Sequence, residues 1–157
     1  MTTITPLMKD RSTDTRTKVM VATSGARLLP SSAVQTLVDD LLPETSLLTP
    51  NIPEAQLILS AAGRPFGEIQ TLNDFKRLGE AVAGLGPRHV LIKGGHCPLD
   101  KQGRVAKTQQ EKAKVVNVLY TEGDHHVFED VYQESKNTHG TGCSLACESS
   151  YAYNHDR

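Results

Sequence analysis

A glycine-rich stretch at residues 137–143, Asn-Thr-His-Gly-Thr-Gly-Cys, has the composition of an anion-binding loop. Glycines just before a helix let several backbone N–H groups converge on one point, and the helix dipole adds positive potential there. Such a loop suits a phosphate or a developing oxyanion, and Cys143 in the first helical turn would lie in a field that favours its thiolate form. A glycine-rich turn with a buried structural cysteine has the same composition, so spacing alone favours the functional interpretation only slightly.

Two further candidates each follow an apolar run that reads as a strand. Lys93 precedes Gly94 and Gly95, and a lysine beside two glycines could reach a phosphate, although a solvated lysine in a tight turn is the more common case. Asn51 and Glu54 offer one amide oxygen and one carboxylate, which can hold a hydrated Mg²⁺ through its waters. Alternatively, Asn51 caps a helix and Glu54 favours its N-terminus, a role that needs no metal.

A zinc site is a weaker alternative. His139, Cys143 and Cys147 lie four residues apart and would share one face of a continuous helix. Gly140 and Gly142 should keep His139 outside the helix, and no fourth ligand stands at a convincing spacing. We therefore prefer the anion-binding interpretation of this segment.

The elements that must position these residues alternate between strands and helices. Apolar runs predict strands at residues 19–22, 46–49, 89–92, 115–120 and 125–130, the last two forming a hairpin. Apolar residues spaced three and four apart predict a first helix, which begins at Ser31 or Ser32 and stops at Pro43. A second helix should have Pro53 in its first turn, and a third should be capped by Thr71 with Asp74. A fourth helix is predicted from 140 to about 151. Residues 98–114 are polar and predict a mobile surface loop. This order predicts the α/β class with a largely parallel sheet, whose carboxyl edge could gather the three candidate sites.

Length and composition narrow the function classes. The chain has 157 residues, 4% aromatic residues and a formal net charge of -1, so we expect neither nucleic-acid nor membrane binding. Three cysteines make a poor disulfide framework and favour reduced thiols in an intracellular, cytoplasmic protein. The polar, Thr-rich residues 1–18 predict a disordered leader before a single domain at 19–157.

With these motifs in view, the chain resembles the hydroxymethylpyrimidine/phosphomethylpyrimidine kinases of thiamine biosynthesis, in the ribokinase-like superfamily. The resemblance spans Val19 to about Ala146 in the family's own order. Its motifs are Val-Met-Val-Ala-Thr-Ser-Gly-Ala-Arg-Leu-Leu at 19–29, Leu-Thr-Pro-Asn-Ile-Pro-Glu-Ala at 48–55, Val-Leu-Ile-Lys-Gly-Gly-His at 90–96 and Asn-Thr-His-Gly-Thr-Gly-Cys-Ser-Leu at 137–145.

The resemblance implies transfer of the γ-phosphoryl group of ATP, with Mg²⁺, to a small pyrimidine substrate and then to its monophosphate. It also implies a homodimer, as in related kinases. It implies that Cys143 is the general base on the acceptor oxygen. It also implies that Val19 lies in the segment that lines the pyrimidine pocket. The remaining implied roles are an anion hole at Gly140, Thr141, Gly142 and Cys143, nucleotide-phosphate contacts at Lys93 and Thr138, and a metal- and phosphate-ordering pair at Asn51 and Glu54.

The two ends depart from the family pattern. The family begins with a glycine-rich acceptor-binding segment that residues 1–18 do not resemble, and it continues beyond Arg157 with further helices. We therefore expect a partial ribokinase-like domain, truncated at both ends. Two alternatives remain: a catalytically incompetent homologue that binds nucleotide or a partner, and a pyridoxal kinase-like enzyme.

Overall fold

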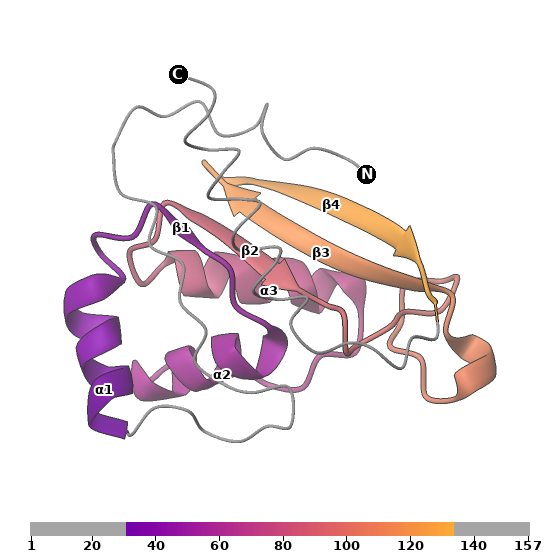
Figure 1. The fold of residues 1–157 in the computed structure, drawn as a ribbon, viewed down its shortest axis with the longest axis horizontal. Helices are drawn as coiled ribbons and strands as arrows, with labels where there is room; N and C mark the ends of the chain where they lie inside the picture. The colour runs from indigo at the N-terminus through magenta and orange to yellow at the C-terminus, as the bar shows by residue number, and fades with distance from the viewer. Residues whose placement is uncertain (1–30, 134–157) are drawn as a thin grey trace.

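The structure is a computed structural model that describes residues 31–133, with side chains from residue 34 (Figure 1). The predicted strand at 19–22 and the predicted helix at 140–151 lie outside this range. The elements in chain order are α1 (Ser31–Thr36), the π-helical η2 (Leu37–Leu41), β1 (Leu47–Leu48), α2 (Ile52–Ala61), α3 (Leu72–Ala83), β2 (His89–Lys93), the 3₁₀ turn η3 (Gln109–Glu111), β3 (Lys114–Thr121) and β4 (Asp124–Val131).

The first helix ends just before Pro43, as its sequence predicts. Its last turn widens into a π-helix, in which the Leu42 N–H donates to the Leu37 carbonyl five residues back, at 2.9 Å. The widened turn still buries Leu37 and Leu42. Gly86 packs against its end: a Cβ there would lie 2.6 Å from the Pro43 Cα, and the φ of Gly86 is +128. Only glycine fits this position, because it has no Cβ and tolerates positive φ.

The strands form a sheet in the order β1-β2-β3-β4 within the described residues. The α/β class is confirmed. The expectation of a largely parallel sheet holds for β1–β2, whereas β2–β3 and β3–β4 are antiparallel, so the described sheet is mixed. The antiparallel pairing of β3 with β4 follows from the predicted hairpin, whose two-residue turn at Glu122 and Gly123 has φ of +51 and +91. Positive φ at both positions is what a tight turn matched to strand twist requires.

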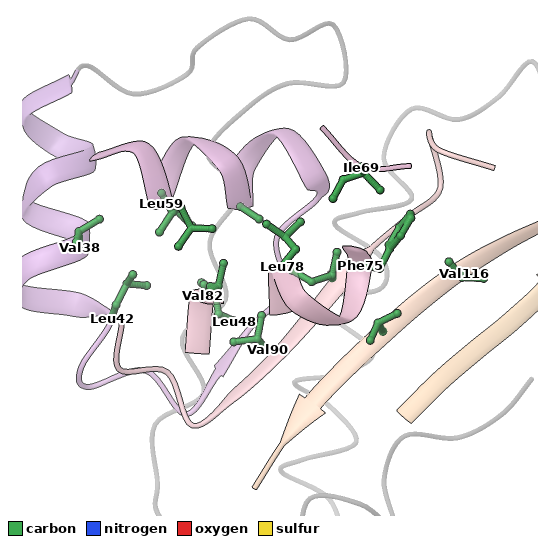
Figure 2. Packing of buried hydrophobic residues seen from close by; sticks show 14 of the residues in the cluster. Val38, Leu42, Leu48, Leu59, Ile69, Phe75, Leu78, Val82, Val90 and Val116 are labelled. Carbon is green, nitrogen blue, oxygen red and sulfur yellow. The ribbon is translucent and has the colours of Figure 1, made fainter. Parts of the chain in front are cut away.

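Helices α2 and α3 cover one face of the sheet, and their contact with it forms the main core (Figure 2). Phe75, Leu78 and Val82 of α3 pack on this face beside Val90 and Val116 of the strands (Figure 2). Residues on the other face alternate with these in sequence, as strand geometry requires. That face buries Leu47, Leu91 and Leu119, with Phe128 packed against them.

The segment between β2 and β3 is exposed at most residues from 101 to 111, in keeping with the predicted surface loop. Leu99 departs from that prediction because it is fully buried and bonded to the start of β3. Its N–H donates to the Lys114 carbonyl at 2.8 Å, and its carbonyl accepts from the N–H groups of Ala113 and Lys114. None of the helices between residues 31 and 133 has the length and apolar character needed to cross a membrane.

Candidate functional site at the carboxyl edge of the sheet

Two of the three sequence-predicted sites lie side by side where the parallel strands β1 and β2 end. Asn51 forms an isolated parallel bridge with Lys93, and the Lys93 N–H donates to the Pro50 carbonyl at 2.9 Å. The carboxyl edge of an α/β sheet is where ligands bind, because loops and helix N-termini converge there. The expectation that Asn51, Glu54 and Lys93 share one edge is therefore confirmed within the described chain.

Asn51 and Glu54 form a reciprocal capping box at the start of α2. The Glu54 N–H donates to the Asn51 Oδ1 at 2.8 Å, and the Asn51 N–H donates to the Glu54 Oε2 at 2.7 Å. Pro53 lies in the first helical turn, where its missing N–H costs nothing. The capping interpretation of these two residues is thus correct, and Glu54 is fully buried.

The same pair also fits a hydrated Mg²⁺ by the chemistry of its donors. Both side chains present oxygen, the ligand that Mg²⁺ prefers, and Mg²⁺ usually keeps several of its waters. The bond from the Glu54 N–H leaves a further lone pair on the Asn51 amide oxygen. Among the described residues, no three His, Cys, Asp or Glu side chains cluster in a way that could hold a metal.

Lys93 is half-buried at the end of β2, and no residue between 31 and 133 accepts a hydrogen bond or ion pair from its ammonium group. The next residue, Gly94, is buried and has no room for a side chain. A Cβ there would lie 2.2 Å from the Val116 carbonyl oxygen and 2.7 Å from the Phe75 Cε1. The glycine therefore lets β2 end tightly against β3 and α3, and it leaves the lysine beside Asn51.

Sequence reasoning did not identify Asn117, which lies directly opposite Lys93 on β3. Its Oδ1 accepts a hydrogen bond from the Gly94 N–H at 3.2 Å. A signal was available: Asn117 is the one amide side chain in the apolar run Val-Val-Asn-Val-Leu-Tyr at 115–120. A polar residue inside a strand needs a partner, and here the partner is the candidate site itself.

Cys97 lies on the same turn, and burial raises the pKa of its thiol. The thiol is therefore unsuited to act as a thiolate nucleophile or base near neutral pH. Its backbone has a structural role, because the Cys97 N–H donates to the Gly94 carbonyl at 2.8 Å and closes the turn.

A basic pocket of about 400 Å³ lies at the start of α3, and the sequence did not predict it. Two of its cations are paired with carboxylates: Arg104 with Asp100 at 3.0 Å and Lys114 with Glu129 at 2.8 Å. The residues that line it are Thr71, Leu72, Asn73, Lys76, Lys101, Gln102, Gly103, Arg104 and Lys114. Its helix N-terminus is also occupied, since the Leu72 N–H donates to Gly103 at 2.9 Å. We give this pocket no role.

The remaining predicted site residues lie outside the described residues. They are Val19, Thr138, Gly140, Thr141, Gly142 and Cys143, together with His139 and Cys147 of the zinc alternative. Their roles stay predictions.

The mixed sheet, the helices on its face and the polar residues at its carboxyl edge define a ribokinase-like α/β fold. A Bacillus subtilis pyridoxal kinase, solved as an ADP complex, matches 88% of this chain and 46% of its own, with a TM-score of 0.64 and 26% identity. A Clostridium difficile phosphomethylpyrimidine kinase matches 87% of this chain and 50% of its own, with a TM-score of 0.54 and 30% identity.

The sequence profile of the family described as phosphomethylpyrimidine kinase matches residues 15–152, and the chain belongs to this family. A hydroxymethylpyrimidine/phosphomethylpyrimidine kinase of Salmonella typhimurium is 38% identical over 128 residues, which are 82% of this chain and 41% of that protein. The chain spans less than half the length of the curated relatives that it matches.

Proposed function

We propose that this chain supplies the phosphate-transfer edge of an ATP-dependent kinase that phosphorylates hydroxymethylpyrimidine and its monophosphate in thiamine biosynthesis. Membership of the phosphomethylpyrimidine kinase family supports the reaction class. The observation that carries the proposal is the backbone bridge between Asn51 and Lys93, which places the lysine and the Asn51–Glu54 capping box at one sheet edge. We further propose a kinase domain over residues 19–157 after a leader at 1–18, a cytoplasmic location and a homodimer.

In this proposal Lys93 neutralises charge on the nucleotide phosphates, with Thr138 as a second contact. Catalysis of phosphoryl transfer rests on positioning and on stabilising charge at the transferring group. Gly140, Thr141 and Gly142 would supply backbone N–H groups to that charge. The acceptor oxygen attacks the γ-phosphorus as the bond to ADP breaks, and its proton passes to Cys143 as general base.

The acceptor and the metal complete the proposal. Val19 would line the pyrimidine pocket together with Cys143. Asn51 and Glu54 would hold the hydrated Mg²⁺ that accompanies ATP and offsets the negative charge of its phosphates. Their capping box fixes both side chains at the start of α2, so they are held in place before any ligand arrives.

An assay on the purified chain tests the reaction. ATP-dependent phosphorylation of hydroxymethylpyrimidine should be abolished by Cys143→Ala. Lys93→Met should weaken Mg²⁺-ATP binding about 10- to 100-fold, which corresponds to losing a charged hydrogen bond. Lys107→Met removes an exposed lysine from the β2–β3 loop and should leave binding unchanged. Wild-type protein that shows no Mg²⁺-ATP binding would contradict the proposal.

Two other outcomes correspond to the two alternatives. Mg²⁺-ATP binding without turnover on any acceptor would support a homologue that binds nucleotide without catalysis. Phosphorylation of pyridoxal in preference to hydroxymethylpyrimidine would support a pyridoxal kinase-like enzyme. The second alternative has a specific basis, because the Bacillus subtilis pyridoxal kinase matches the fold with the higher of the two TM-scores, 0.64 against 0.54.

A further inference from the structure

At the candidate site, a side chain of β3 accepts the hydrogen bond from the backbone that follows β2. Up to Lys93, which pairs with Asn117, the two strands are in register as a regular antiparallel pair. The Lys93 N–H points the other way, to the Pro50 carbonyl of the β1 side. The Gly94 N–H is the next donor toward β3, and it bonds to the side-chain Oδ1 of Asn117 at 3.2 Å. A side-chain acceptor is thus in use where β2 leaves the sheet.

Gly94 is confined from several sides at this point. The Val116 carbonyl oxygen and the Phe75 ring occupy the space where a side chain would project. The Gly94 carbonyl accepts the Cys97 N–H at 2.8 Å, which fixes the following turn. Since Gly94 is buried, its N–H would be left without water or an acceptor if the Asn117 amide were absent. A buried donor without an acceptor is costly, so the backbone would shift to relieve it.

Lys93 and Asn117 also share a face of the sheet. Ile92, Val116 and Val118 all belong to the core under the helices. Because successive strand residues point to opposite faces, the side chains of Lys93 and Asn117 lie on the opposite face. A directly opposed antiparallel pair brings its Cβ atoms to about 5 Å. The amide that fixes the backbone after Lys93 is therefore also a direct neighbour of the Lys93 side chain.

We infer that Asn117 is a positioning residue: its amide oxygen holds the Gly94 N–H and so sets the direction in which Lys93 presents its ammonium group at the phosphate edge. The inference about Lys93 rests on the proposed function. The hydrogen bond itself does not, so the two can be tested apart. Asn117 needs no contact with nucleotide, because it acts through the backbone between Lys93 and Gly94.

Two substitutions of similar size separate the acceptor from the side-chain volume. Asn117→Leu keeps the number and branching of the side-chain heavy atoms and removes the acceptor, whereas Asn117→Asp keeps an acceptor oxygen at the same place. In the full chain, hydrogen exchange of the Gly94 amide followed by NMR should become about tenfold faster in Asn117→Leu. It should stay slow in Asn117→Asp. The Ile92 amide, in the interior of the same strand, reports any general loss of stability and should change less than Gly94.

Binding of Mg²⁺-ATP provides the second readout, measured by calorimetry on wild type, Asn117→Leu and Lys93→Met. We expect Asn117→Leu to weaken binding about three- to tenfold, less than the full loss caused by Lys93→Met. Unchanged Gly94 exchange in Asn117→Leu would overturn the inference. So would faster exchange with unchanged ATP affinity, if Lys93→Met weakens binding. Wild-type protein that does not bind Mg²⁺-ATP would overturn the proposed function. It would also overturn the part of the inference that concerns Lys93. The exchange data would still show whether Asn117 accepts the hydrogen bond from the Gly94 N–H.

Discussion

Asn51 and Glu54 bond to each other twice, at 2.8 and 2.7 Å, and thereby join the end of β1 to the start of α2. The two residues that the sequence offered as metal ligands are thus also the cap of a helix. At Asn51 the two roles do not exclude each other, because the capping bond occupies only one of the two lone pairs of the amide oxygen. A substitution at either residue is expected to have a structural effect that must be separated from any effect on ligand binding.

Asn51→Ala should therefore destabilise the chain without any ligand present. Loss of an N-cap costs about 1 kcal/mol in the free energy of unfolding, because an N–H of the first turn loses its acceptor. Urea denaturation followed by circular dichroism measures the change. Asn51→Asp serves as the control, since aspartate caps as well as asparagine and should retain most of the stability. Equal losses in both variants would contradict the capping role.

Phe75→Ala should be among the most damaging core substitutions, by about 3–5 kcal/mol, because Phe75 is fully buried and its loss leaves a cavity. It should also release the turn after Lys93, since the Phe75 ring lies against Gly94. Phe66→Ala offers a matched control, as Phe66 is only partly buried and packs at the edge of the same core. We expect a smaller loss there in thermal unfolding, and a similar loss at both positions would count against the central place of Phe75 in the core.

The pair Gly94 and Gly95 allows a sharper test of how β2 ends. Gly94→Ala should destabilise the chain by about 1–3 kcal/mol or more, because its Cβ would collide with the Val116 carbonyl oxygen, which cannot move without disturbing β3. Gly95→Ala should be tolerated, because nothing lies within 4 Å of a Cβ at that position. Urea midpoints of the two variants, measured side by side, decide the point. A tolerated Gly94→Ala would show that β2 leaves the sheet less tightly than described.

Local rules in the sequence account for most of the described elements. Thr71 and Asp74 form the predicted capping box of α3, and Pro43 ends the first helix as expected. Contacts between distant residues account for what the sequence did not predict. Leu99 lies in a polar stretch of sequence, and its burial depends on hydrogen bonds with residues 113 and 114 at the start of β3. The role of Asn117 depends on the strand register that places it next to Gly94.

The pairing of the strands could likewise be predicted only in part from the sequence. The hairpin could be predicted from its turn residues, but the antiparallel pairing of β2 with β3 joins residues more than twenty positions apart. No local periodicity encodes that pairing, so a largely parallel sheet was the simpler expectation from alternating strands and helices. The carboxyl edge of β1 and β2 could still be predicted, because it depends only on the one parallel pair.

Acid should destabilise the chain in part through His89. Its Nδ1 lies 2.7 Å from the Thr121 Oγ1 in the buried sheet, and burial, aided by the nearby Arg88 cation, lowers the pKa of His89 below 6.5. The unfolded chain takes up a proton at a higher pH than the folded chain does. The contribution of His89 to stability is therefore complete above pH 6.5 and is lost as the pH falls toward the folded-state pKa.

Urea unfolding of the wild type between pH 7.5 and 5 should accordingly show a fall in the free energy of unfolding below about pH 6.5. His89→Gln keeps a polar side chain that can bond to Thr121 but cannot titrate in this range, so its profile should be flatter than that of the wild type. His96→Gln, the same substitution at an exposed position, is the control. Wild-type and His89→Gln profiles that run parallel over this range would show that His89 stays as easily protonated in the folded chain as in the unfolded one.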